Sequence, residues 1–271
     1  MHSSDGGVSW QPAGLHCSVR SLALTPSALY AGTSRGGVYR SDDRGLTWRA
    51  VSEGLTGFSV PALAVDPTTP TTLYAATNNG VHKSDDCGAT WRAVGLASQR
   101  VRTLAVIPTT PTTLYAGVSY GNEPGVYKSV DSGETWRAVG LPGRTVAALA
   151  IHPVEPAILY AGTDDRGEDA LFRSVDGGAT WSESVRTGYG GITAVVIDPN
   201  APETVYAANE NGKILRSTDG GATWSREKGS PLSSSSLLLV TDPAQPPAIY
   251  VGTSRGVWRL AIDKARWAPY P

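Results

Sequence analysis

Acidic side chains at a regular spacing are the residues of this chain that could do chemistry. The octapeptide Ser-x-Asp-x-Gly-x-(Ser/Thr)-Trp occurs six times, at intervals of 38 to 45 residues. Its aspartates could bind a metal or act as acids, and they are Asp5, Asp43, Asp86, Asp131, Asp176 and Asp219. Short polar residues at turns usually hydrogen-bond the backbone, and a residue found in every repeat cannot mark one unique site. We therefore predict that each octapeptide, which we call a box, forms a structural turn.

A second acidic group, which does not repeat, consists of Asp164, Asp165, Glu168 and Asp169. Paired carboxylates about 5 to 9.5 Å apart can hydrolyse a glycosidic bond, and several together can bind calcium. A solvated loop is the simpler interpretation, with Arg166 as a partner inside it, since charge runs are usually exposed. We expect the loop, keep the four residues as weak metal candidates, and predict neither a catalytic residue nor a cofactor.

Around each box the sequence predicts four short strands. Apolar runs closed by proline indicate the first strand, at residues 19–26, 60–67, 101–108, 146–153, 192–199 and 236–243. A second strand carries Tyr30, Tyr74, Tyr115, Tyr160, Tyr206 or Tyr250, a third precedes the box, and a fourth begins at its tryptophan. His82 stands where Tyr39 and Tyr127 stand in other repeats, and we interpret it as a scaffold substitution. Four strands joined by hairpins form one antiparallel sheet, and no helical period appears, so the chain is predicted to be all-β.

These repeats resemble the Asp-box (bacterial neuraminidase repeat) superfamily of β-propellers over essentially the whole chain. The resemblance implies four-stranded antiparallel blades around a central channel, as in sialidases, sortilin-type receptors, xyloglucan-cleaving glycosidases and photosystem II assembly-factor-like proteins. The repeat sequences resemble those of the last group most, at residues 29–33 and 37–41. We expect residues 1–271 to form a single propeller domain of six blades, or else a fragment of a seven-bladed one.

The two ends of the chain are less regular than the repeats. The box at Ser3 has no third strand before it, while Leu260 and Ile262 stand where serine and aspartate belong after Trp258. We predict that residues 1–13 supply the outer strand of the last blade, which would remove free sheet edges. In the alternative, Trp267 opens an outer strand of its own and the chain is a fragment.

Enzymatic activity is not favoured by the motifs. The Arg-Ile-Pro motif of sialidases is absent, and residues 33–40, which match the catalytic loop that the resemblance implies for xyloglucan-cleaving relatives, carry Ser34 at the position of the acid. The prediction is a non-enzymatic scaffold that binds a protein partner. A carbohydrate-binding module or glycosidase, and a repeat domain of a larger extracellular protein, remain as alternatives.

Residues that do not repeat indicate where a partner would bind. Loops before the first strand and between the second and third strands share one face of a blade, opposite the boxes. The candidate binding residues on that face are arginines and aromatics, the types enriched at energetic centres of interfaces, namely Arg35, Phe58, Arg100, Tyr120, Arg144, Arg166, Arg186, Tyr189 and Arg255. They would suit an acidic or polar partner, and residues 119–125 form the best single candidate loop. Propeller loops are polar in any case, so a binding role competes with ordinary solvation.

Composition excludes several other classes of protein. The formal net charge is -1 and the cations are scattered, which disfavours nucleic acid and anionic membranes as partners. No segment reaches the roughly 20 apolar residues of a membrane span, and the first residues do not form a signal peptide. By resemblance the protein is expected to be secreted or periplasmic. Cys17 and Cys87 are predicted to be free thiols, and nothing indicates the oligomeric state.

Overall fold

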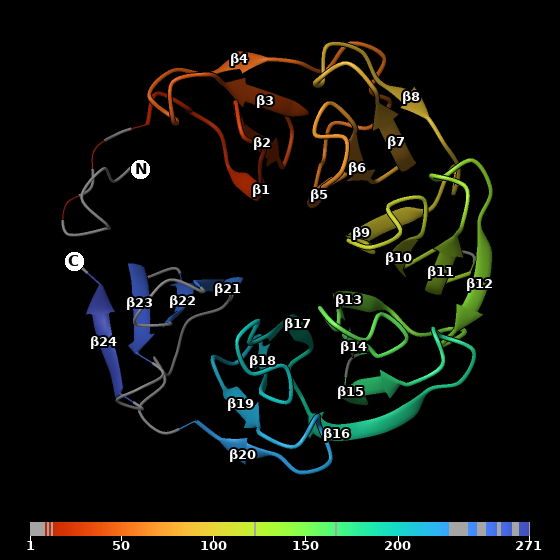
Figure 1. Cartoon of the computed structure of the whole chain (residues 1–271), viewed down its shortest axis with the longest axis vertical. Helices are drawn as coiled ribbons and strands as arrows, with labels where there is room; N and C mark the ends of the chain where they lie inside the picture. The colour runs from red at the N-terminus through yellow and green to blue at the C-terminus, as the bar shows by residue number, and fades with distance from the viewer. Residues whose placement is uncertain are drawn as a thin grey trace. The chain divides into compact units, whose positions relative to one another are not determined.

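The structure, a computed structural model, describes residues 9, 11, 13–121, 123–165, 167–227, 238–242, 248–253, 256–261 and 266–270. Every regular element within these ranges is a strand, and the strands form six antiparallel four-stranded sheets (Figure 1). The all-β prediction is therefore confirmed, and six such blades are the architecture of a β-propeller. The chain divides into two compact units, Met1–Gly143 and Arg144–Pro271, with three sheets in each.

The first unit holds sheets 1 to 3. Sheet 1 contains β1 (Val19–Leu24), β2 (Leu29–Thr33), β3 (Val38–Ser41) and β4 (Arg49–Ala50). Sheet 2 contains β5 (Ala62–Val65), β6 (Leu73–Thr77), β7 (Gly80–Ser84) and β8 (Arg92–Ala93). Sheet 3 contains β9 (Arg100–Val106), β10 (Leu114–Ser119), β11 (Gly125–Ser129) and β12 (Arg137–Gly140). Each sheet runs in chain order, as expected of strands joined by hairpins.

The second unit holds sheets 4 to 6. Sheet 4 contains β13 (Val146–Ile151), β14 (Leu159–Thr163), β15 (Asp169–Ser174) and β16 (Ser182–Gly188). Sheet 5 contains β17 (Ile192–Ile197), β18 (Val205–Asn209), β19 (Ile214–Ser217) and β20 (Ser225–Arg226). Sheet 6 contains β21 (Leu238–Asp242), β22 (Ala248–Thr253), β23 (Gly256–Ala261) and β24 (Arg266–Tyr270).

The core of each unit lies between neighbouring sheets. The first strands of successive sheets are in contact, β1 with β5 and β5 with β9 in the first unit, and β13 with β17 and β17 with β21 in the second. The second strands are buried on both faces as a result, and their tyrosines are at most 1% exposed in sheets 1 to 5, at Tyr30, Tyr74, Tyr115, Tyr160 and Tyr206. Burial of these aromatic rings supplies a large part of the apolar area that holds adjacent sheets together.

The outer strand of sheet 6 comes from the C-terminal segment. β23, the strand that carries Trp258, pairs with β24, and Leu260 lies opposite Trp267. The C-terminal segment therefore takes the position predicted for residues 1–13, as in the alternative built on Trp267. Most of residues 1–13 lies outside the described part of the chain, so their contribution to the last blade stays a prediction.

Two further expectations concern thiols and membranes. Cys17 and Cys87 are both free. Within the described residues, no helix has the length and apolar character needed to cross a bilayer.

Candidate functional site

The box aspartates accept hydrogen bonds from residues of the turns in which they lie. Asp43 accepts hydrogen bonds from Thr47 Oγ1 (2.5 Å), the Thr47 amide (2.8 Å), Ser41 Oγ (2.8 Å) and the Leu46 amide (3.0 Å). The bonds from Thr47, followed by the bond from Ser41, lower the pKa of Asp43 to about 2. All four donors lie within five residues of the carboxylate, so the box is a self-contained turn.

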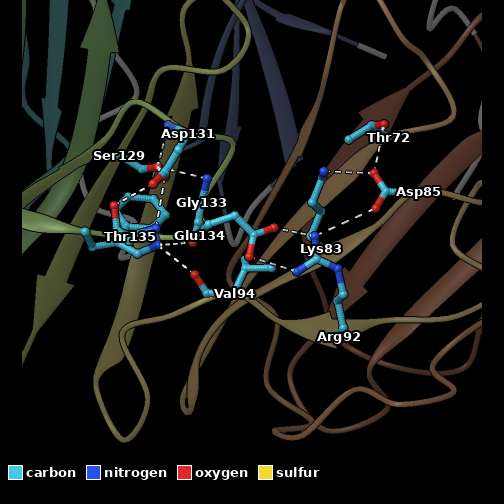
Figure 2. Close-up of polar contacts among 11 residues, drawn as sticks. Thr72, Lys83, Asp85, Arg92, Val94, Ser129, Asp131, Gly133, Glu134 and Thr135 are labelled. Atoms are coloured by element: carbon cyan, nitrogen blue, oxygen red, sulfur yellow. Dashed lines mark hydrogen bonds and ion pairs between the residues drawn. The ribbon is translucent and has the colours of Figure 1, made fainter.

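The same arrangement recurs in the other described boxes, and Figure 2 shows it around Asp131. The pKa is lowered to about 2 at Asp131, Asp176 and Asp219, and it is also lowered at Asp86. Asp5 lies outside the described residues. These carboxylates are committed to the backbone and leave little capacity for a ligand.

Hydrogen bonds from tyrosine and tryptophan connect the boxes that begin at Ser84, Ser129 and Ser217 to the preceding sheet. The Tyr30 hydroxyl donates to the carbonyl of Cys87 in the next box at 2.9 Å, and Tyr160 donates to Gly220 in the same way at 2.7 Å. In the opposite direction, Trp91 Nε1 donates to the carbonyl of Val51 at 2.8 Å. The box is thus both a turn and a link between sheets.

An ion pair also joins sheet 2 to the box of sheet 3. The guanidinium of Arg92, the first residue of β8, makes two hydrogen bonds to the Glu134 carboxylate in the box of sheet 3, while Lys83 pairs with Asp85 at 2.9 Å (Figure 2). The side chains of Arg92 and Glu134 are about half exposed. This cluster joins sheets 2 and 3 and is structural.

Apart from Arg186, the predicted binding residues that the structure describes lie in or beside the loops at the opposite edge of the sheets. Successive antiparallel strands bring these two kinds of loop to the same end. In the first unit, Arg35 lies in the β2–β3 loop and Phe58 in the β4–β5 loop, where the Gly37 amide donates to the Phe58 carbonyl at 3.0 Å. Arg100 is the first residue of β9 and lies opposite Ser119, which directly precedes Tyr120. The structure therefore gives two neighbouring pairs, Arg35 with the Phe58 loop and Arg100 with Tyr120.

All four of these side chains are exposed, with Phe58 at 64% and Tyr120 at 43%. Tyr120 also adopts a left-handed backbone conformation with φ of 31°. An exposed aromatic ring at a strained position is not explained by packing.

In the second unit, Tyr189 is the most exposed of the predicted aromatics, at 80%. Its carbonyl accepts a hydrogen bond from Asn211 Nδ2 at 2.9 Å, which fixes the loop between β16 and β17. Arg186 lies inside β16, where it pairs with Glu183, and not in a loop. Arg166 and Arg255 lie outside the described residues.

Arg144 is occupied by the acidic loop of sheet 4. It donates to Asp165 Oδ2 at 3.0 Å and to the Glu168 carbonyl at 3.2 Å, and its guanidinium lies 5.2 Å from the ring centre of Phe172. Asp165 Oδ1 also accepts from the Thr145 amide at 2.7 Å. Arg144 therefore holds the loop in shape.

The remaining carboxylates of this loop are also engaged. Asp169 is 1% exposed and accepts from the Asp165 amide at 2.6 Å. The Glu168 carboxylate lies 3.7 Å from Arg144. Asp164 packs against the backbone of Gly191. A Cβ added to Gly191 would lie 2.6 Å from the Cβ of Asp164. No group of three or more potential metal ligands occurs among the described residues.

His82 has a role that the sequence did not reveal. It is buried in β7, and its Nε2 contacts both the amide and the hydroxyl of Thr56, in the loop that carries Phe58. The replacement of a repeated tyrosine by histidine was the only available signal.

Comparison with known proteins identifies the type of sequence repeat and finds solved structures with a similar fold. The BNR/Asp-box repeat model matches residues 215–226, and no curated protein matches the sequence. An ancestral GH74 enzyme is similar with a TM-score of 0.76 and 19% identity over 92% of this chain and 37% of its own. The GH74 xyloglucanase of Xanthomonas campestris gives 0.75 and 20% over 93% and 46%.

A third similar structure is YCF48 bound to a D1 peptide, with a TM-score of 0.68 and 13% identity over 94% of this chain and 82% of its own. The chain thus spans less than half the length of the two GH74 proteins and most of YCF48. Since every identity is at or below 20%, the likeness concerns the fold alone. The chain carries Asp-box repeats on an all-β fold of six four-stranded blades, a β-propeller.

Proposed function

We propose that this protein binds a peptide segment of a protein partner through the loop edges of its sheets and catalyses no reaction there. The observation that carries the proposal is the exposure of three unrepeated aromatic side chains at those edges, at 64% for Phe58, 43% for Tyr120 and 80% for Tyr189. Aromatic rings held on a rigid scaffold bury much apolar area at a small entropic cost when a partner binds.

The cations beside these rings suggest the chemistry of the partner. Arg35 and Arg100 are exposed, so their guanidinium groups are accessible to carboxylate or carbonyl oxygens. A polar or acidic segment with apolar side chains would suit both kinds of residue. The peptide in the YCF48 structure is a precedent for such binding on a similar fold.

A glycosidase has less support in this chain, although two similar structures are GH74 proteins. A catalytic acid must reach its substrate, whereas Asp169 is buried and Asp165 is held by Arg144. Turnover of a glycan panel that disappears in Asp164→Ala would favour the glycosidase. A repeat domain of a larger extracellular protein also stays open, and secretion or a periplasmic location is part of the proposal.

The test is peptide selection followed by measurement of affinity. Peptides selected from a phage-displayed random library on the full chain would be measured by calorimetry against Phe58→Ser, Tyr120→Asn and Tyr189→Ser. We expect at least one variant to weaken binding about tenfold or more, as for an interface hot spot. Asparagine is chosen at position 120 because it tolerates a positive φ.

The matched control is Val130→Ser, which removes an exposed apolar side chain (59%) from a box. Its affinity should equal that of the native chain. Selected peptides that respond to Val130→Ser and to none of the loop variants would contradict the proposal.

A further inference from the structure

A buried histidine fastens the loop that presents Phe58. His82 is 0% exposed, and its Nε2 lies 2.8 Å from Thr56 Oγ1 and 3.2 Å from the Thr56 amide nitrogen. An amide N–H can only donate, so Nε2 is the acceptor and the neutral ring carries its proton on Nδ1. Thr56 Oγ1 in turn accepts from Asn79 Nδ2 at 3.2 Å, which leaves its own proton free to point at Nε2.

The surroundings of the imidazole oppose a positive charge. Burial is the one cause that shifts the pKa of His82, and it lowers it. The strands on either side place Ala75 and Ala93 opposite His82. Of the nearby charged residues, Lys83 pairs with Asp85, and neither Glu53 of the loop nor Arg100 and Arg102 of β9 shift its pKa. Nδ1 has no hydrogen-bond partner within the described structure.

Protonation of the ring would break the contact with the Thr56 amide. Nε2 would then carry a proton and could donate to Thr56 Oγ1, but it could no longer accept from the amide. The Thr56 amide loses its acceptor in this part-buried contact, and the charge on the buried ring adds a desolvation cost. Exposure of the ring to water removes both penalties.

The loop is built so that a short stretch can move. Leu55 and Val60 are 7% and 0% exposed and anchor its ends. Between them, Gly57 has a φ of 115°, a conformation that glycine adopts without strain. Phe58 directly follows this glycine, and its carbonyl also accepts from the Gly37 amide at 3.0 Å, so release of Thr56 shifts the exposed ring about that second attachment.

We propose that His82 is an acid-sensitive latch, whose protonation releases Thr56 and shifts Phe58. The latch itself stands on the contacts of His82. Its use as a control of partner binding rests on the function proposed above. Burial lowers the pKa of His82 while the loop is closed. His82 therefore holds the loop at pH values above the ordinary histidine pKa of about 6.5, and this hold weakens as the pH falls below that value.

The latch is tested on the full chain by hydrogen exchange between about pH 8 and pH 5, corrected for the intrinsic exchange rate. Protection of the Thr56 amide should fall below pH 6.5 by up to about tenfold per pH unit, the limit for release coupled to one proton. Amides of β6 should stay protected, which separates loop release from global unfolding. Protection of Thr56 that does not change with pH would overturn the latch.

Two variants separate titration from packing. His82→Gln keeps an acceptor near the position of Nε2, and His82→Tyr introduces the residue found at Tyr39 and Tyr127. Neither side chain titrates in this range, so the decline in Thr56 protection should vanish in both. A decline of the same size in either folded variant would refute the role of His82.

A selected peptide then distinguishes the latch from the binding function. If the peptide contacts Phe58, its affinity for the native chain should drop on acidification, and its affinity for His82→Gln should not. Acid release of the loop with unchanged peptide affinity would support the latch and count against the role of Phe58. Peptide binding that depends on Phe58, with pH-independent protection of Thr56, would support the function and overturn the latch.

Discussion

Tyr120 holds a backbone conformation that few side chains tolerate. Its φ of 31° carries a cost of about 1–3 kcal/mol for a residue with a Cβ, and the ring stays 43% exposed. The strain is consistent with a side chain retained for contact with a partner.

Replacement of Tyr120 by glycine should therefore separate stability from binding. We expect Tyr120→Gly to keep the free energy of unfolding or raise it by about 1 kcal/mol, since glycine adopts a positive φ freely. Affinity for a selected peptide should fall. Urea denaturation and calorimetry measure the two effects.

Tyr189→Gly provides the comparison, because Tyr189 is exposed but does not have a positive φ. It should lower stability by about 0.5–1 kcal/mol through added freedom in the unfolded chain. A larger loss of stability in Tyr120→Gly than in Tyr189→Gly would contradict the strain argument.

Residue roles could be predicted from the sequence where their contacts are local. The turn at Asp43 follows from its own octapeptide, because every donor lies within five residues of the carboxylate. The contact between Thr56 and His82 joins residues 26 apart and depends on how a loop crosses a sheet. The structural use of Arg144 depends in the same way on the fold of residues 164–169.

At the scale of the strand, two buried tyrosines, Tyr30 and Tyr160, each donate a hydrogen bond from the second strand of one sheet to the box of the following sheet. We call this contact the tyrosine clasp. Tyr160 on β14 donates to the Gly220 carbonyl in the next box at 2.7 Å. Tyr206 on β18 is equally buried, yet its hydroxyl has no hydrogen-bond partner in the described structure, and burial raises its pKa to about 12. The following repeat has Leu260 in place of the box serine, so the acceptor turn is missing from the sequence.

This contrast predicts opposite effects of one chemical change. Tyr160→Phe should lower the free energy of unfolding by about 1 kcal/mol, because a buried hydrogen bond is lost. Tyr206→Phe should be neutral or stabilising, since it removes a buried hydroxyl without a partner. Both are read from denaturation midpoints, and equal losses in the two variants would refute the clasp.

Strands were predictable in number and order, because apolar runs, prolines and glycine turns mark each of them. Their lengths and outer partners were harder to predict. β16 extends to Gly188 and so includes Arg186, which the sequence analysis grouped with the binding loops. β24 occupies the outer edge of sheet 6 through pairing with β23, and a pairing between whole strands is weakly encoded in any single segment.

Across the whole molecule, the boxes make stability depend on acid. The pKa is lowered to about 2 at four box aspartates, Asp43, Asp131, Asp176 and Asp219. A carboxyl with a lowered pKa stabilises the fold above its ordinary value of 3.8, and that contribution is lost as the pH falls toward 2. At Asp131 and Asp219, protonation also weakens a turn that is bonded to the preceding sheet.

We expect the thermal midpoint to drop steeply between about pH 4 and pH 2, the window set by these shifts. Circular dichroism melts at closely spaced pH values would measure the drop. Asp131→Asn should lower the midpoint at neutral pH and reduce the steepness of the acid limb. A midpoint that stays constant through this window would contradict the prediction.

The tyrosine clasp has a consequence for the history of the chain. The donor on the second strand and the acceptor in the box belong to the same repeat, and each acts on an adjacent repeat, as Tyr30 does on Cys87. A gene segment that encodes one full repeat therefore specifies both halves of the contact. Duplication of such a segment would yield a sheet that already fits its neighbour, which allows an array of this kind to lengthen before its copies diverge.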